Sequence, residues 1–338
     1  MVVVAHYFGE TPHGLSAFAW GWLGVSIFFV LSGFLVGGIV LDQRDDHGFL
    51  QRFWIKRAAR ILPAYLAVLA AVFLAQQAFA DRPWMDDVFP PWVYLTFTQN
   101  ILMPLEGAEG SKWLAPTWTL AVEEQFYLLI PLLICWLSAR ALAPTLAVLW
   151  AAALLFRLTI HEASPIGALT LLPSRMDLLL AGVLAAMAVR RMDLRDRLTA
   201  LRVVPLLAAI AVLAVGLTRD HQLFVVLTPT IVSLGAAAYV LALVLGAPEG
   251  RRLEGPVMGF FGAISYGLYL FHQPVAGLMH GLILGRRPDI DTAEGWAVSF
   301  AAVAVSIAAA WASWRWLEAP ILKRARVMKS LPAPASQT

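Results

Sequence analysis

Residues 20–41 read WGWLGVSIFFVLSGFLVGGIVL, an uninterrupted apolar run without a charged side chain. A helix rises about 1.5 Å per residue, so about 20 such residues cross the hydrocarbon core of a bilayer. The run does not alternate polar and apolar residues, which argues against a strand of a membrane barrel. It therefore predicts a membrane-spanning helix.

Eight further runs of the same kind follow along the chain. The nine predicted spans cover roughly 20–41, 60–80, 118–138, 143–160, 175–190, 203–218, 222–246, 257–284 and 295–317. The span at 175–190 is the weakest, because it is short and carries Arg175 and Asp177 at its start. The predicted fold class is all-α, a polytopic transmembrane helical bundle.

The composition agrees with this fold class. Of the 338 residues, 60% are hydrophobic and 14% are charged, and the mean hydropathy is +0.72. Soluble domains average about 45–50% apolar and about 25% charged residues, so a soluble globular protein is excluded. The chain has one cysteine, Cys135, which excludes an internal disulfide framework and a Cys-based zinc site. We expect no bound metal and no permanently bound cofactor.

The placement of Lys and Arg predicts the orientation. Basic residues gather in alternate connections, at 44–60, 140, 190–202, 251–252 and 323–329. The other connections, including 81–117 and 285–294, are acidic or mixed. Because basic loops stay in the cytoplasm, we expect a multi-pass inner-membrane protein with a cytoplasmic C-terminus. The net charge of +3 is explained by this asymmetry, so no nucleic-acid partner is expected.

The two ends of the chain carry separate expectations. Residues 1–6 are expected to be the outer end of a helix that rises from the cytoplasm, which adds a tenth helix to the nine spans and implies a truncated start. Residues 1–325 would form the membrane domain. Residues 326–338 are expected to form a disordered cytoplasmic tail.

A few titratable side chains lie in or beside the spans, where an ionisable group needs a partner or a function. His6 is a candidate base, and the alternative is a structural histidine bonded to nearby backbone. Glu123 shares a helix face with Tyr127 at i, i+4. Its carboxylate could orient a histidine or hold a hydroxyl, or it could simply be held by a helix N-terminus.

Two further groups have a functional and a structural interpretation. Ser265, Tyr269 and His272 lie near one helical stripe, which indicates either a watery cavity or hydrogen bonding between helices. Arg57 and Arg60 share a face at i, i+3, so they could grip a phosphate. The alternative is that they set topology at the lipid headgroups.

Taken together, these segments resemble the acyltransferase-3 family of multi-pass membrane O-acyltransferases. The resemblance runs over nearly the whole chain, and its markers stand in the family's order. They are His6, FFVLSGF at 28–34, RAARILP at 57–63, WTLAVE at 118–123 with Phe126-Tyr127, Arg175-Met-Asp177 with Gly182, Ser265-Tyr266 with Tyr269 and His272, and EAP at 318–320.

The resemblance implies transfer of an acyl group, often acetyl, from cytoplasmic acyl-CoA to a hydroxyl of a glycan, glycolipid or other small acceptor. It implies that His6 is the catalytic base, and we expect Glu123 to assist it. Arg57 and Arg60 would bind the acyl-CoA, a co-substrate. The remaining candidates would support the acceptor or the oxyanion: Tyr127, Arg175, Asp177, Ser265, Tyr269 and His272.

The family normally carries an arginine eleven positions before the histidine, and that position lies before Met1 here. The rival functional class is a transporter that exports a glycan or an acylated small molecule, since buried His, Glu and Arg also suit proton relays. The sequence shows no repeated halves of the kind many transporters carry, which favours the enzyme.

Overall fold

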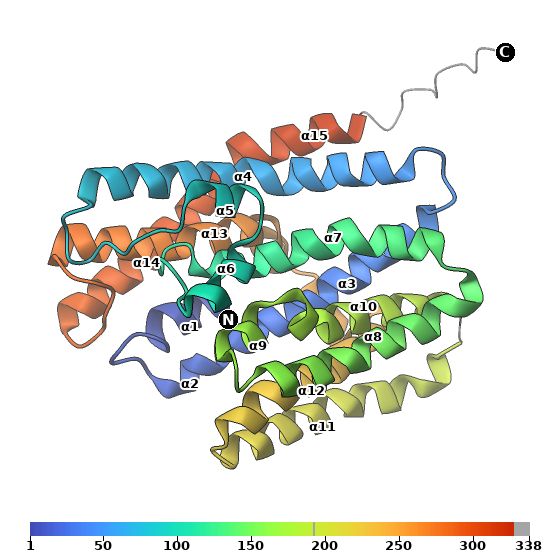
Figure 1. Ribbon diagram of the computed structural model, residues 1–338. Coiled ribbons are helices and arrows are strands. Elements are labelled where there is room, and N and C mark those ends of the chain that lie inside the picture. The colour runs from blue at the N-terminus through green and yellow to red at the C-terminus, as the bar shows by residue number, and fades with distance from the viewer. Residues whose placement is uncertain (192, 328–338) are drawn as a thin grey trace.

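The computed structural model describes residues 1–191 and 193–327, and every regular element in these ranges is a helix. The all-α fold class predicted from the sequence is therefore confirmed. The long helices run side by side, and several short helices gather at one end of the bundle (Figure 1).

The long helices are α3 (Leu23–Gln43), α4 (Phe49–Phe79), α7 (Trp118–Trp136), α8 (Ala139–Ile160), α10 (Leu172–Arg191), α11 (Leu198–Leu217), α12 (His221–Val244), α13 (Pro256–Leu284) and α14 (Ala293–Ser313). The short ones are α1 (Val2–Phe8), α2 (Ser16–Ala19), α5 (Pro91–Leu95), α6 (Gln99–Glu106), α9 (Pro165–Thr170) and α15 (Ala319–Val327). Single turns complete the set: η1 (Trp20–Trp22), η2 (Ala115–Thr117), η3 (Arg195–Arg197), η4 (Pro248–Leu253) and the π-helix η5 (Trp314–Glu318).

Eight helices of the described ranges are long and apolar enough to cross a membrane, so the protein is a multi-pass membrane protein. Each of them overlaps one of the nine predicted spans. The ninth prediction corresponds to α13, which has 29 residues but is not among the eight. Its polar residues, Ser265, Tyr266, Tyr269 and His272 among them, lower its hydropathy.

One predicted boundary is wrong. The span predicted at 60–80 begins eleven residues earlier, at Phe49, so the basic segment before it is helical rather than a loop. Phe49 and Phe53 are buried and anchor this first part of α4 to the core. Arg57 and Arg60 consequently lie two to three turns inside a helix, about 12–17 Å from its start at about 1.5 Å per residue.

Helices α3 and α10 form the tightest pair at the centre of the bundle. Two glycines allow this approach. A Cβ atom on Gly33 would collide with the carbonyl oxygen of Leu179, and one on Gly182 would collide with the carbonyl oxygen of Val30. Small residues are the usual means of close helix packing in membranes. The helix predicted at 175–190, the weakest span by sequence, is therefore a central one.

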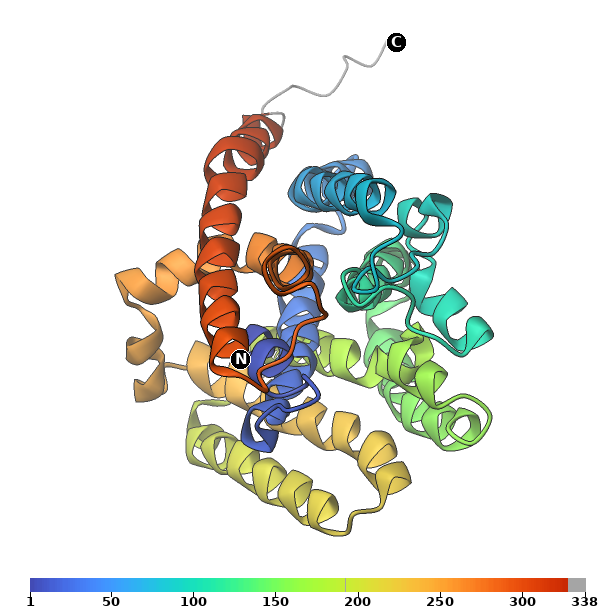
Figure 2. The same ribbon diagram turned by 90° about the vertical axis from the view of Figure 1, so that its left-hand side faces the viewer.

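The bundle has two distinct ends. At the outer end, as the sequence orients the chain, α3, α7 and α10 begin and the short helices α1, α2, α5, α6 and α9 gather (Figure 1). Figure 2 views the bundle from this end and shows α1 near its middle, surrounded by longer helices. At the opposite, basic end lie Arg44, Arg140, Arg190, Arg191 and Arg251.

The predicted tail began at residue 326. Helix α15 continues to Val327, so the boundary falls inside a helix. The remainder of the predicted tail, 328–338, lies outside the described residues.

The contact between α3 and α10 generates a stability prediction. Gly182→Ala places a methyl group against backbone that cannot yield, and overpacking of this kind costs about 1–3 kcal/mol. We expect a lower midpoint of thermal unfolding in detergent. The matched control is Gly262→Ala on α13, where a Cβ meets nothing within 4 Å; it should leave the midpoint unchanged or raise it slightly. Equal unfolding midpoints for Gly182→Ala and Gly262→Ala would contradict the close packing of α3 against α10.

Candidate active site

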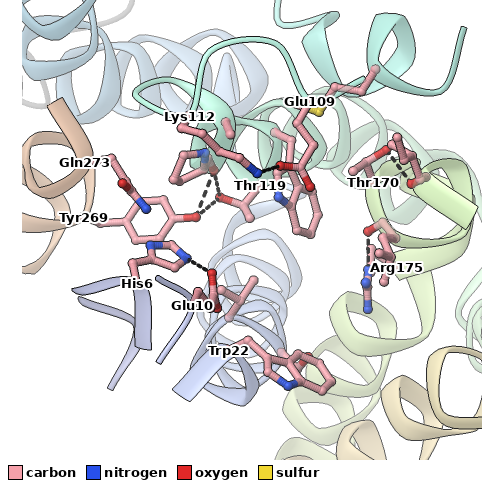
Figure 3. A pocket seen from close by; sticks show the side chains of 18 of the residues that line it. His6, Glu10, Trp22, Glu109, Lys112, Thr119, Thr170, Arg175, Tyr269 and Gln273 are labelled. Atoms are coloured by element: carbon pink, nitrogen blue, oxygen red, sulfur yellow. Dashed lines mark hydrogen bonds and ion pairs between the residues drawn. The ribbon is translucent and has the colours of Figure 1, made fainter. Parts of the chain in front are cut away.

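A cavity of about 270 Å³ lies at the outer end of the bundle. Seven α-helices and their connections contribute to its wall: α1, α3, α6, α7, α9, α10 and α13. Figure 3 shows part of this wall. Its lining residues are His6, Glu10, Trp22, Val25, Ser26, Phe29, Met103, Glu109, Lys112, Ala115, Pro116, Trp118, Thr119, Ile166, Leu169, Thr170, Arg175, Tyr269 and Gln273. Three of the residues predicted from the sequence, His6, Arg175 and Tyr269, face this cavity.

Helix α1 places His6 in the cavity wall because its other face is anchored. The hydroxyl of Tyr7 donates to the backbone carbonyl of His272 at 2.7 Å and lies 2.9 Å from the hydroxyl oxygen of Ser306. The ring of Phe8 stacks on Trp296 with 5.4 Å between ring centroids. Seven residues would not hold a helix in water by themselves, so these contacts determine where His6 sits.

The imidazoles of His6 and His272 form a hydrogen-bonded pair. Nδ1 of His6 lies 2.6 Å from Nε2 of His272, and Nδ1 of His272 lies 2.6 Å from the carbonyl oxygen of Tyr269. A carbonyl only accepts, so His272 carries its proton on Nδ1 and its Nε2 accepts the proton of His6 Nδ1. The neutral pair therefore leaves Nε2 of His6 as a free base.

The carboxylate of Glu10 lies beside Nε2 of His6. Its Oε2 atom lies 3.5 Å from Nε2 of His6. Burial raises the pKa of Glu10, and the opposite charge of Lys112 counteracts part of this effect. Sequence reasoning missed Glu10, although the i, i+4 spacing from His6 could have indicated it.

Tyr269 connects the histidine pair to the start of α7. Its hydroxyl donates to the carbonyl oxygen of Pro116 at 2.9 Å and lies 2.8 Å from the hydroxyl oxygen of Thr119. Tyr269 thus fixes one wall of the cavity, while its own carbonyl orients His272.

Arg175 forms the wall on the far side from His6 (Figure 3). Its Nε atom donates to the carbonyl oxygen of Leu169 at 2.6 Å, and its guanidinium lies over the ring of Trp118 at 5.6 Å. Only 4% of this residue is exposed.

The structure does not bring Glu123 to His6, the partner that the sequence suggested. Glu123 is buried deeper along α7, where its Oε1 accepts from the hydroxyl of Tyr127 at 2.9 Å. The Tyr127 hydroxyl also lies 2.5 Å from that of Ser32. The guanidinium of Arg57 covers the Tyr127 ring at 5.2 Å. Glu123, Tyr127 and Arg57 thus form a second cluster, away from the residues that line the cavity.

Arg60 belongs to the same region but has a different partner. Its Nη1 atom lies 3.9 Å from Oε2 of Glu318, a fully buried carboxylate on the π-helix η5. The guanidinium lies over the rings of Tyr266 and Trp314, at 5.8 and 5.3 Å. The EAP segment at 318–320 therefore holds one of the two candidate donor-binding arginines.

Two predicted site residues, Asp177 and Ser265, are not among the residues that line this cavity. Asp177 is fully buried and pairs with Arg157, 2.6 Å between Oδ2 and Nη2, and Thr230 donates to the same oxygen at 2.7 Å. Arg157 also donates to the carbonyl oxygens of Val226 and Ser174. Ser265 is exposed and donates to the carbonyl oxygen of Gly262 in its own helix. Neither residue lines the cavity, because the helix faces that carry them point elsewhere.

One group of possible metal ligands occurs in the described ranges, on the outer loops. His13, Asp289 and Asp291 bring three ligand atoms within 4.8 Å of one another. Nδ1 of His13 already lies 2.8 Å from Asp289, and Asp291 pairs with Arg286 at 2.6 Å. These contacts satisfy the carboxylates without an ion, and they tie the loop after α1 to the loop after α13.

The chain belongs to the acyltransferase family whose profile, described as an acyltransferase domain, matches residues 1–315. The residues that carried the resemblance in the sequence lie within this range, except the EAP segment at 318–320.

Curated relatives agree with this membership. An O-acetyltransferase named OatA from Staphylococcus aureus (strain MRSA252) is 25% identical over 349 residues, which cover 94% of this chain and 55% of that protein. A peptidoglycan O-acetyltransferase, also named OatA, from Listeria monocytogenes serovar 1/2a (strain ATCC BAA-679 / EGD-e) is 33% identical over 125 residues, 34% of this chain and 20% of that protein. The chain spans about half the length of the first curated relatives it matches. No solved structure matches it.

The Arg157–Asp177 pair generates a second stability prediction. Asp177→Asn leaves the buried Arg157 charge without its counter-ion, and breaking such a pair costs about 3–5 kcal/mol. The matched control is Asp42→Asn at the basic end, where Asp42 is 55% exposed and pairs with Arg190 at 2.7 Å. An exposed pair contributes about 0–1 kcal/mol. Thermal unfolding of both variants in detergent tests the difference, and similar losses would contradict a structural role for Asp177.

Proposed function

We propose that this protein is a membrane O-acyltransferase that moves an acyl group, acetyl in the simplest case, from acyl-CoA to a hydroxyl of a glycan, glycolipid or other small acceptor. The observation that carries the proposal is the chain from the Tyr269 carbonyl through His272 to His6, which leaves Nε2 of His6 unprotonated in the cavity wall. Family membership and the names of the relatives support the same reaction class.

The chemistry follows from that nitrogen. Nε2 of His6 removes the proton of the acceptor hydroxyl while its oxygen attacks the thioester carbonyl. The tetrahedral intermediate then collapses, the carbon–sulfur bond breaks, and the proton passes from Nε2 to the sulfur of CoA. While His6 carries the extra proton, the Glu10 carboxylate at 3.5 Å and the acceptor nitrogen of His272 stabilise the imidazolium.

The donor would enter from the basic end. Arg57 and Arg60 are the arginines that would hold the phosphates of CoA, since guanidinium groups bind phosphate oxygens in pairs. Helix α7 runs from the cavity, at Thr119, to the Arg57 cluster, at Tyr127. The eight residue steps from Thr119 to Tyr127 span about 12 Å, a distance that a long flexible thioester arm can bridge.

The acceptor would enter from the outer end. The cavity combines the aromatic faces of Trp22 and Trp118 with polar groups of Thr119, Thr170 and Gln273. Such a lining suits a hydroxylated ligand that has both apolar and polar faces. The name of the Listeria relative, a peptidoglycan O-acetyltransferase, supports a glycan as the acceptor class.

The test uses purified full-length chain in lipid nanodiscs with acetyl-CoA labelled in the acetyl group. We expect label in the acceptor and an equal release of CoA. Acceptor-independent solute flux in proteoliposomes, without label transfer, would instead support a transporter, and neither activity would support a scaffold.

His6 and its partner generate a kinetic prediction. His6→Ala should lower kcat by about 10²–10⁴, the usual contribution of a positioned base. His272→Ala should also slow the reaction, while His272→Gln should recover part of it because the amide oxygen still accepts the His6 Nδ1 proton. His47→Ala, an exposed histidine at the basic end, is the control. Equal rates for His272→Ala and His272→Gln would contradict the proposal that His272 keeps the proton of His6 on Nδ1.

Arg57 generates a prediction about the donor. Arg57→Ala should raise the KM for acetyl-CoA by roughly tenfold or more, because a charged hydrogen bond contributes about 1.5–3 kcal/mol, and should leave the KM for the acceptor nearly unchanged. Arg52→Ala, on the same helix and with 38% of its side chain exposed, serves as the control. An unchanged donor KM in Arg57→Ala would indicate that this arginine only sets topology.

A further inference from the structure

The guanidinium of Arg175 has no ion-pair partner in the cavity wall. Five His, Glu, Lys or Arg side chains line the cavity, and four of them form two contacts. His6 lies against Glu10 at 3.5 Å, and Nζ of Lys112 lies 2.5 Å from Oε2 of Glu109. The fifth is Arg175. In the described ranges, no carboxylate lies within the 4.0 Å of an ion pair to its guanidinium.

The obvious partner is already engaged elsewhere. Asp177, two residues along α10, makes two hydrogen bonds to Arg157, at 3.0 and 2.6 Å. Arg175 donates only from Nε, to the carbonyl oxygen of Leu169. Its guanidinium face lies on Trp118. The two terminal nitrogens are therefore left to the cavity, although the residue as a whole is 4% exposed.

A buried guanidinium without a counter-ion is costly. It is tolerated where a ligand supplies the missing charge, and the planar fork of arginine matches the two oxygens of a carboxylate or phosphate. We propose that Arg175 binds an anionic group, a carboxylate or a phosphate, on the acceptor whose hydroxyl is presented to His6. This inference rests on the proposed function and narrows its substrate class to acidic acceptors.

The position of Arg175 distinguishes this role from oxyanion stabilisation. His6, Glu10 and Tyr269 lie together on one side of the cavity, and Arg175 lies across it beside Thr170 (Figure 3). An oxyanion forms on the carbon that the hydroxyl attacks, so its donors must adjoin the base. A cation across the cavity acts on a remote part of the ligand, and such contacts orient the reacting group.

The experiment compares two acceptors that have the same hydroxyls and differ in charge. Methyl β-D-glucuronamide and methyl β-D-glucuronide share their hydroxyls at C2, C3 and C4, and the first has a neutral amide at C6 where the second has a carboxylate. In phosphatidylcholine nanodiscs with labelled acetyl-CoA, wild type should prefer the glucuronide in kcat/KM by roughly tenfold to a hundredfold. Arg175→Gln should remove the preference, and Arg175→Lys should retain part of it. Arg82→Gln, an exposed arginine in an outer loop, should leave the ratio unchanged.

A binding measurement separates this inference from the proposed function. Calorimetry of the two sugars without donor should show the same preference in wild type. If label reaches neither sugar while the glucuronide still binds more tightly through Arg175, the proposed acyl transfer is contradicted and the proposed anion site is supported. Equal binding of both sugars to wild type, or an unchanged preference in Arg175→Gln, overturns the anion site even if transfer occurs.

The other possible source of a phosphate for Arg175 is a lipid headgroup of the membrane. The calorimetry is therefore repeated in nanodiscs that contain phosphatidylglycerol. If this lipid abolishes the glucuronide preference and stabilises wild type but not Arg175→Gln against heat, the site belongs to a lipid headgroup and the acceptor assignment is overturned. A preference that persists supports the acceptor.

Discussion

Polar groups inside a hydrocarbon layer find no water, so each one must be satisfied by the protein itself. This constraint organises the bundle. Arg157 is fully buried on α8, and it uses Asp177, Thr230 and two backbone carbonyls to satisfy its guanidinium. Glu123 is satisfied in the same way by Tyr127. The Arg157–Asp177 pair joins α8 to α10, and the contact between the hydroxyls of Tyr127 and Ser32 joins α7 to α3. Hydrophobic packing alone would leave these helices free to rotate, because lipid tails are as apolar as the helix surfaces.

The same constraint makes the unsatisfied groups informative. Nε2 of His6 and the terminal nitrogens of Arg175 are among the polar atoms that the cavity wall offers to a ligand. Each is held rigidly by neighbours: His6 by His272 and by the anchoring of α1, Arg175 by Leu169 and Trp118. A base and a cation fixed on opposite sides of one cavity can orient a ligand without reorganisation during the reaction.

The sequence was most informative about features that depend on one segment at a time. The length of an apolar run determines whether a helix can span the membrane, so the fold class followed from the sequence. Helix faces, in contrast, were harder to assign. Ser265 shares a stripe with Tyr269, yet only Tyr269 reaches the cavity, because α13 presents the two residues to different neighbours.

The sequence by itself determined a helical membrane bundle, its family, and candidate residues for the proposed chemistry, His6, His272 and Arg175 among them. Only the tertiary structure decided the pairings: Glu10 rather than Glu123 beside His6, and Arg157 as the partner of Asp177. The physical reason is that hydrophobic length is encoded locally, whereas a contact between helices depends on the rotation and depth of each, which the packing of the whole bundle sets.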